Sequence, residues 1–195
     1  MAAKEMYFAF GSNMNPERMR QRKAFFTARM GAKLPDYKMS FSFRGPNGGG
    51  GGNITPEKGS AVFGALYSLE DGGLDKLDVF EMVARGCYRR EKVTVEALDG
   101  ETVEATTYIV TEEFRQEGLV PRRDYLDHCL AGKDVLPEDY YAFLESFKQV
   151  CQDWIKQELR NEFESGLYAW AFIVVQTALM PHVECTSSRS WFNFE

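Results

Sequence analysis

The feature that most restricts the fold of this 195-residue chain is the stretch from residue 88 to residue 110. Its two halves, YRREKVTVEAL and ETVEATTYIV, alternate between apolar and polar residues, and Asp99-Gly100 lies at their junction. Alternation with a period of two predicts a strand with one buried face, and Asp-Gly is a strong signal for a tight turn. This stretch therefore predicts a β-hairpin, and with it an antiparallel sheet.

The remaining elements are predicted from apolar runs and from helical spacing. We expect strands at residues 6–10, 37–43 and 61–69, and helices at residues 16–26, 71–81, 122–132 and 136–163. Gly64, inside the third of these strands, predicts a bulge or a close backbone approach. Because strands fill the first half and helices the second, we expect an α+β fold: a mostly antiparallel β-sheet or small barrel with flanking helices and a helical C-terminal extension.

Composition narrows the class of protein. With 44% hydrophobic and 27% charged residues, the chain has the composition of a soluble globular protein. A net charge of −6 argues against a duplex nucleic-acid binder, which needs a basic face. The longest apolar stretch, residues 167–180, is shorter than the roughly 20 residues of a membrane-spanning helix. We therefore expect a cytoplasmic protein that binds neither nucleic acid nor membrane.

Cysteine and histidine do not form a metal-binding pattern. The four cysteines are scattered without a C-x-x-C pair, and the two histidines lie far apart in the sequence. Zinc sites use closely spaced ligands, so we expect no metal and reduced thiols.

The stretch YFAFGSNMNPERM, residues 7–19, passes from a buried strand into a helix. Asn15 is a good N-cap, and Pro16 suits the first helical position. Between strand and helix, the backbone N–H groups around Gly11 and Ser12 could hold a carboxylate or a phosphate. The spacing alone also fits a simple strand-to-helix turn, and both interpretations stay open at this point.

Two further features have a functional and a plain interpretation. The run Gly48–Gly52 suggests a phosphate loop, but it lacks the Gly-Lys-Ser/Thr ending, so residues 44–60 are expected to form a flexible surface loop or lid. Glu81 ends an apolar helical segment beside Phe80 and Met82. A carboxylate there would be partly desolvated and suited to carrying a proton, or it would be a solvated residue at a helix end.

These signals occur in one order, and in that order the chain resembles the γ-glutamylcyclotransferase family. The resemblance covers about residues 6–147. It rests on YFAFGSN, where the family has a strand ending in Tyr-Gly-Ser-Asn, and then on VFGALYSL, LDKLDVFE, GCYRREKVTV and VPRRDYLDHCLAGKDVLPEDYYAFL. Phe10 replaces the family's usual tyrosine, and Met82 replaces the glycine that normally follows the catalytic glutamate. The opening of the glutathione-specific branch, of the Tyr-Gly-Ser-Leu kind, fits less well.

The resemblance implies an enzyme that acts on a small γ-glutamyl substrate without a cofactor or a metal. The α-amine of a γ-glutamyl amide attacks its own γ-carbonyl, which releases 5-oxoproline and a free amine or amino acid. The implied catalytic residue is Glu81, which takes a proton from the amine and passes it to the leaving nitrogen. The implied substrate-binding residues are Tyr7, Phe8, Ala9, Phe10, Gly11, Ser12 and Tyr125.

The family-like domain is expected to span residues 1–147. Residues 148–195 are then a helical and aromatic extension, which packs on the domain or serves in association, so that a homodimer is among the expected partners. Two other functions stay open: an enzyme that removes a γ-glutamyl protecting group from a biosynthetic intermediate, and a binding module that keeps the fold without turnover. The presence of Glu81 favours an enzyme.

Overall fold

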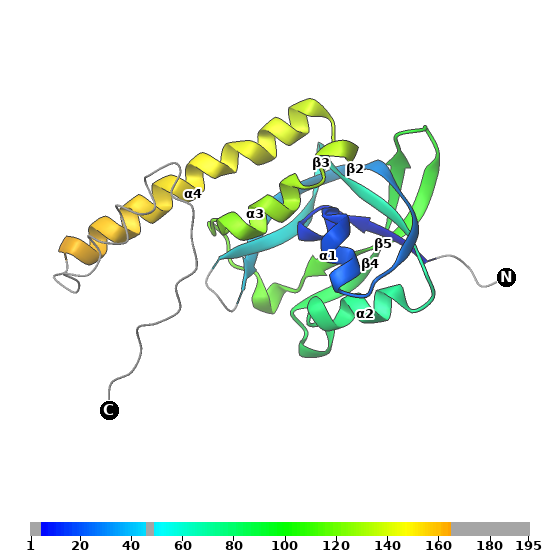
Figure 1. The fold of residues 1–195 in the computed structure, drawn as a ribbon, viewed down its shortest axis with the longest axis horizontal. Coiled ribbons are helices and arrows are strands. Elements are labelled where there is room, and N and C mark those ends of the chain that lie inside the picture. Colours follow the sequence, from blue (N-terminus) through cyan, green and yellow to red (C-terminus); the bar gives the residue numbers. More distant parts are fainter. Residues whose placement is uncertain (1–4, 46–48, 165–195) are drawn as a thin grey trace, which may run out of the picture. The chain divides into compact units, whose positions relative to one another are not determined.

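The computed structural model describes residues 5–45 and 49–164. Residues up to Asp153 form one compact unit, which holds everything discussed below. Within the described residues, the five strands β1–β5 close into a barrel in the order β1-β3-β2-β4-β5 (Figure 1). The strands are β1 (Glu5–Ala9), β2 (Phe26–Arg44), β3 (Gly50–Leu69), β4 (Tyr88–Ala97) and β5 (Thr102–Val110). The helices are α1 (Pro16–Gln21), α2 (Gly73–Phe80), α3 (Arg123–Leu130) and α4 (Glu138–Glu164), with 3-10 turns η1 (Ser12–Met14), η2 (Val83–Arg85), η3 (Glu112–Phe114) and η4 (Lys133–Val135).

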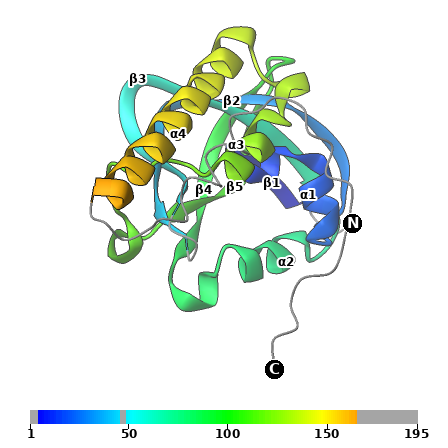
Figure 2. The same ribbon diagram turned by 60° about the vertical axis from the view of Figure 1, so that its left-hand side comes forward.

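The predicted fold class is confirmed. All strand pairs are antiparallel except β1 with β5, which pair in parallel at Tyr7 and Thr106. Strands β4 and β5 form the predicted hairpin, from Tyr88 opposite Val110 to Glu96 opposite Thr102. Figures 1 and 2 show the short helices α3, α1 and α2 along one side of the barrel, with α1 between the other two.

The predicted loop at residues 44–60 is wrong, and the predicted strand at 37–43 is only part of a longer one. Strands β2 and β3 pair from Phe26 opposite Leu69 to Arg44 opposite Gly50, so most of the glycine-rich segment is strand. The glycines are needed because other side chains reach their backbone. A Cβ on Gly51 would lie 3.0 Å from the Tyr88 hydroxyl, and one on Gly52 would lie 2.9 Å from the Tyr125 hydroxyl.

Gly64 makes the predicted close approach. A Cβ added there would lie closer than 3.0 Å to the carbonyl oxygen of Ala9, a separation that real Cβ atoms essentially never show. Glycine at this position therefore lets β3 pack tightly against the end of β1, directly before the turn at Gly11.

Helix α1 is shorter than predicted. Its N-cap is as expected, because Asn15 Oδ1 accepts hydrogen bonds from the backbone N–H groups of Glu17 and Arg18. The predicted helix to residue 26 is wrong, because α1 ends at Gln21 in a turn that places Lys23 in the left-handed region with φ 58°. The bonds from Lys23 N–H to Arg20 O and from Ala24 N–H to Met19 O form a Schellman motif. Such a motif usually has glycine at this position, so lysine gave no signal in the sequence.

The predicted domain boundary after residue 147 lies inside α4, and the division into domains stays a prediction. Residues 165–195 of the predicted extension lie outside the described residues. None of the described helices is both long and apolar enough to span a membrane.

Candidate active site

A cavity of about 280 Å³ opens where all five strands contribute to its wall. Tyr7, Phe43, Tyr88 and Tyr108 come from β1, β2, β4 and β5, and β3 contributes its first three glycines. The rest of the wall comes from the turn at Gly11–Asn13, from α1, from the end of α2 and from α3. Mouths of small barrels are common sites for small ligands.

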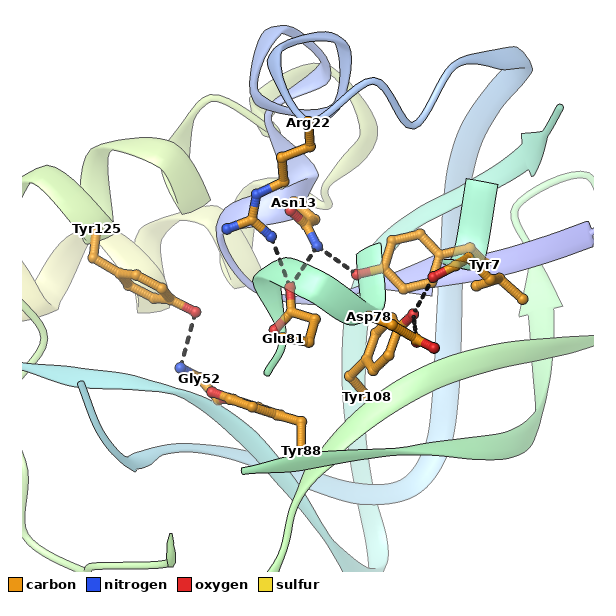
Figure 3. Close-up of polar contacts among 10 residues, drawn as sticks. Tyr7, Asn13, Arg22, Gly52, Asp78, Glu81, Tyr88, Tyr108 and Tyr125 are labelled. Carbon is orange, nitrogen blue, oxygen red and sulfur yellow. Dashed lines mark hydrogen bonds and ion pairs between the residues drawn. The ribbon is translucent and has the colours of Figure 1, made fainter. Parts of the chain in front are cut away.

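Glu81 lies in this cavity as the residue that ends helix α2. Its Oε1 accepts a hydrogen bond from Arg22 Nη1 at 2.7 Å and another from Asn13 Nδ2 at 3.1 Å (Figure 3). Its Oε2 has no hydrogen-bond partner among the described residues. The side chain is 15% exposed. One carboxylate oxygen is therefore anchored, and the other is free to face a ligand.

The sequence-based description of the surroundings of Glu81 needs a correction. We expected mainly apolar neighbours, but its carboxylate forms an ion pair with Arg22, whose own side chain is 10% exposed. The Arg22 guanidinium also lies over the ring of Phe80, 4.8 Å from its centroid. These two contacts hold Arg22 in place, and Arg22 in turn fixes the direction of the Glu81 carboxylate.

Sequence reasoning missed Arg22 and did not assign Asn13 a role. Asn13 Nδ2 donates to both the Tyr7 hydroxyl, at 2.8 Å, and Glu81, and so connects β1 with α2. Asn13 could have been found from its place in the Gly-Ser-Asn stretch. Arg22 lies 59 positions from its partner, and no local pattern marks it.

Buried tyrosines line the wall beside Glu81. Burial, and next the charge of Glu81, raise the pKa of Tyr7 well above its usual value. Tyr7 packs edge-on against Tyr108, with 5.7 Å between ring centroids, and the Tyr108 hydroxyl donates to Asp78. Burial and the Asp78 carboxylate raise the pKa of Tyr108 as well. Both phenols stay neutral near pH 7, so they offer polar contacts without charge.

Tyr125 lies across the cavity from Glu81, close to the Gly11–Ser12 turn. Its hydroxyl accepts a hydrogen bond from the Gly52 backbone N–H at 2.9 Å (Figure 3). Burial raises the pKa of Tyr125, and the N–H groups of Gly52 and Ser12 partly oppose that rise. A Cβ on Gly11 would lie 2.7 Å from the Tyr125 hydroxyl, so this approach requires glycine.

The structure brings most of the predicted site residues together. Tyr7, Phe10, Gly11, Ser12, Glu81 and Tyr125 all line the cavity. Phe8 and Ala9 do not, because both are buried in the core at 0% and 1% exposure. Phe10 is 6% exposed and presents a ring edge without a hydroxyl.

Met82 also lines the cavity, in a backbone conformation that few side chains adopt. Its φ of 52° and ψ of 41° lie in the left-handed region, which favours glycine. The chain thus keeps a strained non-glycine residue next to Glu81, and its thioether narrows the cavity there.

The described residues contain no group of three or more His, Cys, Asp or Glu side chains placed to hold a metal ion. The described cysteines, Cys87, Cys129 and Cys151, are buried free thiols.

Comparison with known proteins gives consistent results. A family profile described as the AIG2-like family matches residues 61–144. The chain is 30% identical over 152 residues to a protein of Bos taurus named gamma-glutamylcyclotransferase, covering 73% of this chain and 78% of that protein. It is 27% identical over 166 residues to a protein of the same name from Mus musculus, covering 82% and 85%. Among solved structures, a Homo sapiens protein described as uncharacterized matches with a TM-score of 0.66 and 28% identity, covering 73% of this chain and 86% of that one.

Proposed function

The chain belongs to the γ-glutamylcyclotransferase family, and we propose that it is an enzyme that releases 5-oxoproline from a γ-glutamyl amide. The observation that carries the proposal is the asymmetry of Glu81. Its Oε1 is held by Arg22 and Asn13, whereas its Oε2 has no protein partner among the described residues and lies at the cavity. A carboxylate arranged in this way is suited to take a proton and to give it back.

The reaction begins at the substrate's own α-amine. An α-amine has a pKa of about 8, so near neutral pH most of it is protonated and cannot attack a carbonyl. Glu81 Oε2 removes one proton, and the amine nitrogen then attacks the γ-carbonyl carbon. A five-membered lactam forms as the bond from that carbon to the leaving nitrogen breaks. Glu81 returns the proton to the leaving nitrogen, so that acid and base roles fall on one residue.

The remaining residues would fold the substrate so that amine and carbonyl meet. The backbone N–H groups at Gly11 and Ser12 are assigned to the α-carboxylate, with the Tyr125 hydroxyl beside them. This assignment is supported by the separation of the two groups across the cavity, with Glu81 on one side and Tyr125 on the other. Holding the glutamyl chain at both places turns the attack into an oriented intramolecular step.

The chemistry transfers protons and one acyl group, and no electrons. It therefore calls for positioned donors and acceptors rather than a redox cofactor. The neutral tyrosines Tyr7, Tyr88 and Tyr108 supply such groups around the reacting centre without adding charge that would compete with Glu81.

The test is release of 5-oxoproline from γ-glutamyl-alanine, γ-glutamyl-ε-lysine, a γ-glutamyl alkylamine and glutathione. We expect turnover of at least one compound by the wild type, and a loss in kcat of about 100-fold or more in Glu81→Gln, because glutamine cannot carry the proton. Glu17→Gln is the matched control, since Glu17 is a 63% exposed carboxylate outside the cavity. Full activity in folded Glu81→Gln would refute the assigned role, and no 5-oxoproline from any compound would favour a bulkier substrate or a binding module.

A further inference from the structure

One arginine in the cavity has no anionic partner. Among the described residues, three arginines make no ion pair: Arg18, Arg44 and Arg85. Arg44 and Arg85 are exposed, so water solvates their charge. Arg18 is only partly exposed and lines the cavity. A cation that is neither solvated nor paired is rare, because burial of a charge is costly unless a partner compensates for it.

The surroundings of Arg18 make this cost specific. Its Nε is sealed from solvent and has no hydrogen-bond partner. Burial, followed by the like charge of Arg22, lowers the pKa of the Arg18 guanidinium. Arg22 is already paired with Glu81, so Arg18 holds the cavity's uncommitted positive charge on this wall. An anion bound beside Arg18 would remove the penalty.

His128 adds a neutral donor next to Arg18. Asn15 Oδ1 accepts from the backbone of α1, so its Nδ2 is the group that faces His128 Nδ1 at 3.0 Å. Nδ1 must therefore accept this hydrogen bond, which leaves the ring proton on Nε2. Burial, and next the charge of Arg18, lower the pKa of His128 and keep the ring neutral near pH 7. Nε2–H has no partner among the described residues, and His128 lines the cavity.

We propose that Arg18 and His128 form a second carboxylate subsite, which holds the carboxylate of the leaving amino acid of a γ-glutamyl dipeptide. The inference rests on the proposed function. That function already assigns the glutamyl α-carboxylate to the Gly11–Ser12 turn and the α-amine to Glu81, so the only remaining anionic group is on the leaving side. Arg18 lies within electrostatic reach of both Glu81 and Tyr125, so a carboxylate there would be close to the reacting amide.

The subsite predicts a preference that can be measured with two matched compounds. γ-Glutamyl-alanine and γ-glutamylethylamide differ only in the carboxylate on the leaving group. We expect Arg18→Gln to lower kcat/KM for γ-glutamyl-alanine by about 10- to 100-fold, the usual cost of losing a charge-assisted contact, and to leave γ-glutamylethylamide nearly unchanged. Arg18→Lys should recover part of the loss, since it keeps the charge without the planar fork. Arg20→Gln is the control, because Arg20 lies on the same helix, is 54% exposed and does not line the cavity.

Binding provides a readout that does not require turnover. Calorimetry with Glu81→Gln and with the double variant Glu81→Gln/Arg18→Gln should give a weaker Kd for γ-glutamyl-alanine alone in the double variant. Equal losses on both compounds would assign Arg18 to the glutamyl part and overturn the inference, and so would no loss on either. If the wild-type protein neither binds nor converts any γ-glutamyl compound, the proposed function itself fails. If both compounds bind but Arg18 does not discriminate between them, only the subsite fails.

Discussion

The ion pair between Arg22 and Glu81 should be the most strongly coupled surface-accessible pair in the site, and a double-mutant cycle can measure it. The side chains are 10% and 15% exposed and their charged atoms are 2.7 Å apart. Two unit charges about 4 Å apart attract by about 4 kcal/mol at an effective dielectric constant of about 20. Desolvation offsets part of this attraction, and we expect a coupling energy of about 2–3 kcal/mol in the free energy of unfolding.

The cycle uses Arg22→Met, Glu81→Gln and the double variant, with urea unfolding followed by near-ultraviolet circular dichroism of the buried tyrosines. Each single variant leaves one charge without its partner in a partly buried place, so the double variant should be less destabilised than the sum of the two. The matched control is Arg20 with Glu17, a pair that is 54% and 63% exposed, for which about 0.3 kcal/mol is expected. Equal coupling in the two cycles would refute the reasoning, because burial would then make no difference.

Three further predictions concern the framework around the cavity. Gly64→Ala should lower the free energy of unfolding by about 2–3 kcal/mol, because its Cβ would overlap the Ala9 carbonyl, and thermal unfolding should show a Tm lower by about 5–10 °C. An unchanged Tm would contradict the close approach. Met82→Gly should leave the free energy of unfolding within about 1 kcal/mol, whereas Met82→Val should lower it further, because a β-branched residue fits the left-handed region poorly. Equal stability of the two variants in urea would count against strain at this position. The Arg29 guanidinium lowers the pKa of Asp134, so the stability from this pair is present above the unfolded pKa of 3.8 and is lost as the pH falls through the lower folded value. The difference in unfolding free energy between wild type and Asp134→Asn should therefore shrink on acidification, and a difference independent of pH would contradict the assignment.

Local signals in the sequence were enough for several parts of the fold. The hairpin at Asp99-Gly100, the N-cap at Asn15 and the end of α2 at Glu81 each depend on residues close together in the chain. Side-chain periodicity, turn preference and capping act over a few residues, so they can be read without knowing the rest of the structure. The order of such signals also carried the family resemblance, and through it the identity of Tyr125 as a cavity residue.

The tertiary structure decided what depends on neighbours distant in sequence. Gly50–Gly52 looked like a loop because glycine alone disfavours a strand, yet the hydroxyls of Tyr88 and Tyr125 approach this backbone and leave no room for a side chain. Arg22 meets Glu81 across 59 positions, and only barrel closure brings α1 and the end of α2 together. The unpaired state of Arg18 is likewise a property of the folded cavity. Charge type is written in the sequence, but whether a charge is solvated, paired or left for a ligand depends on which surfaces the fold brings into contact.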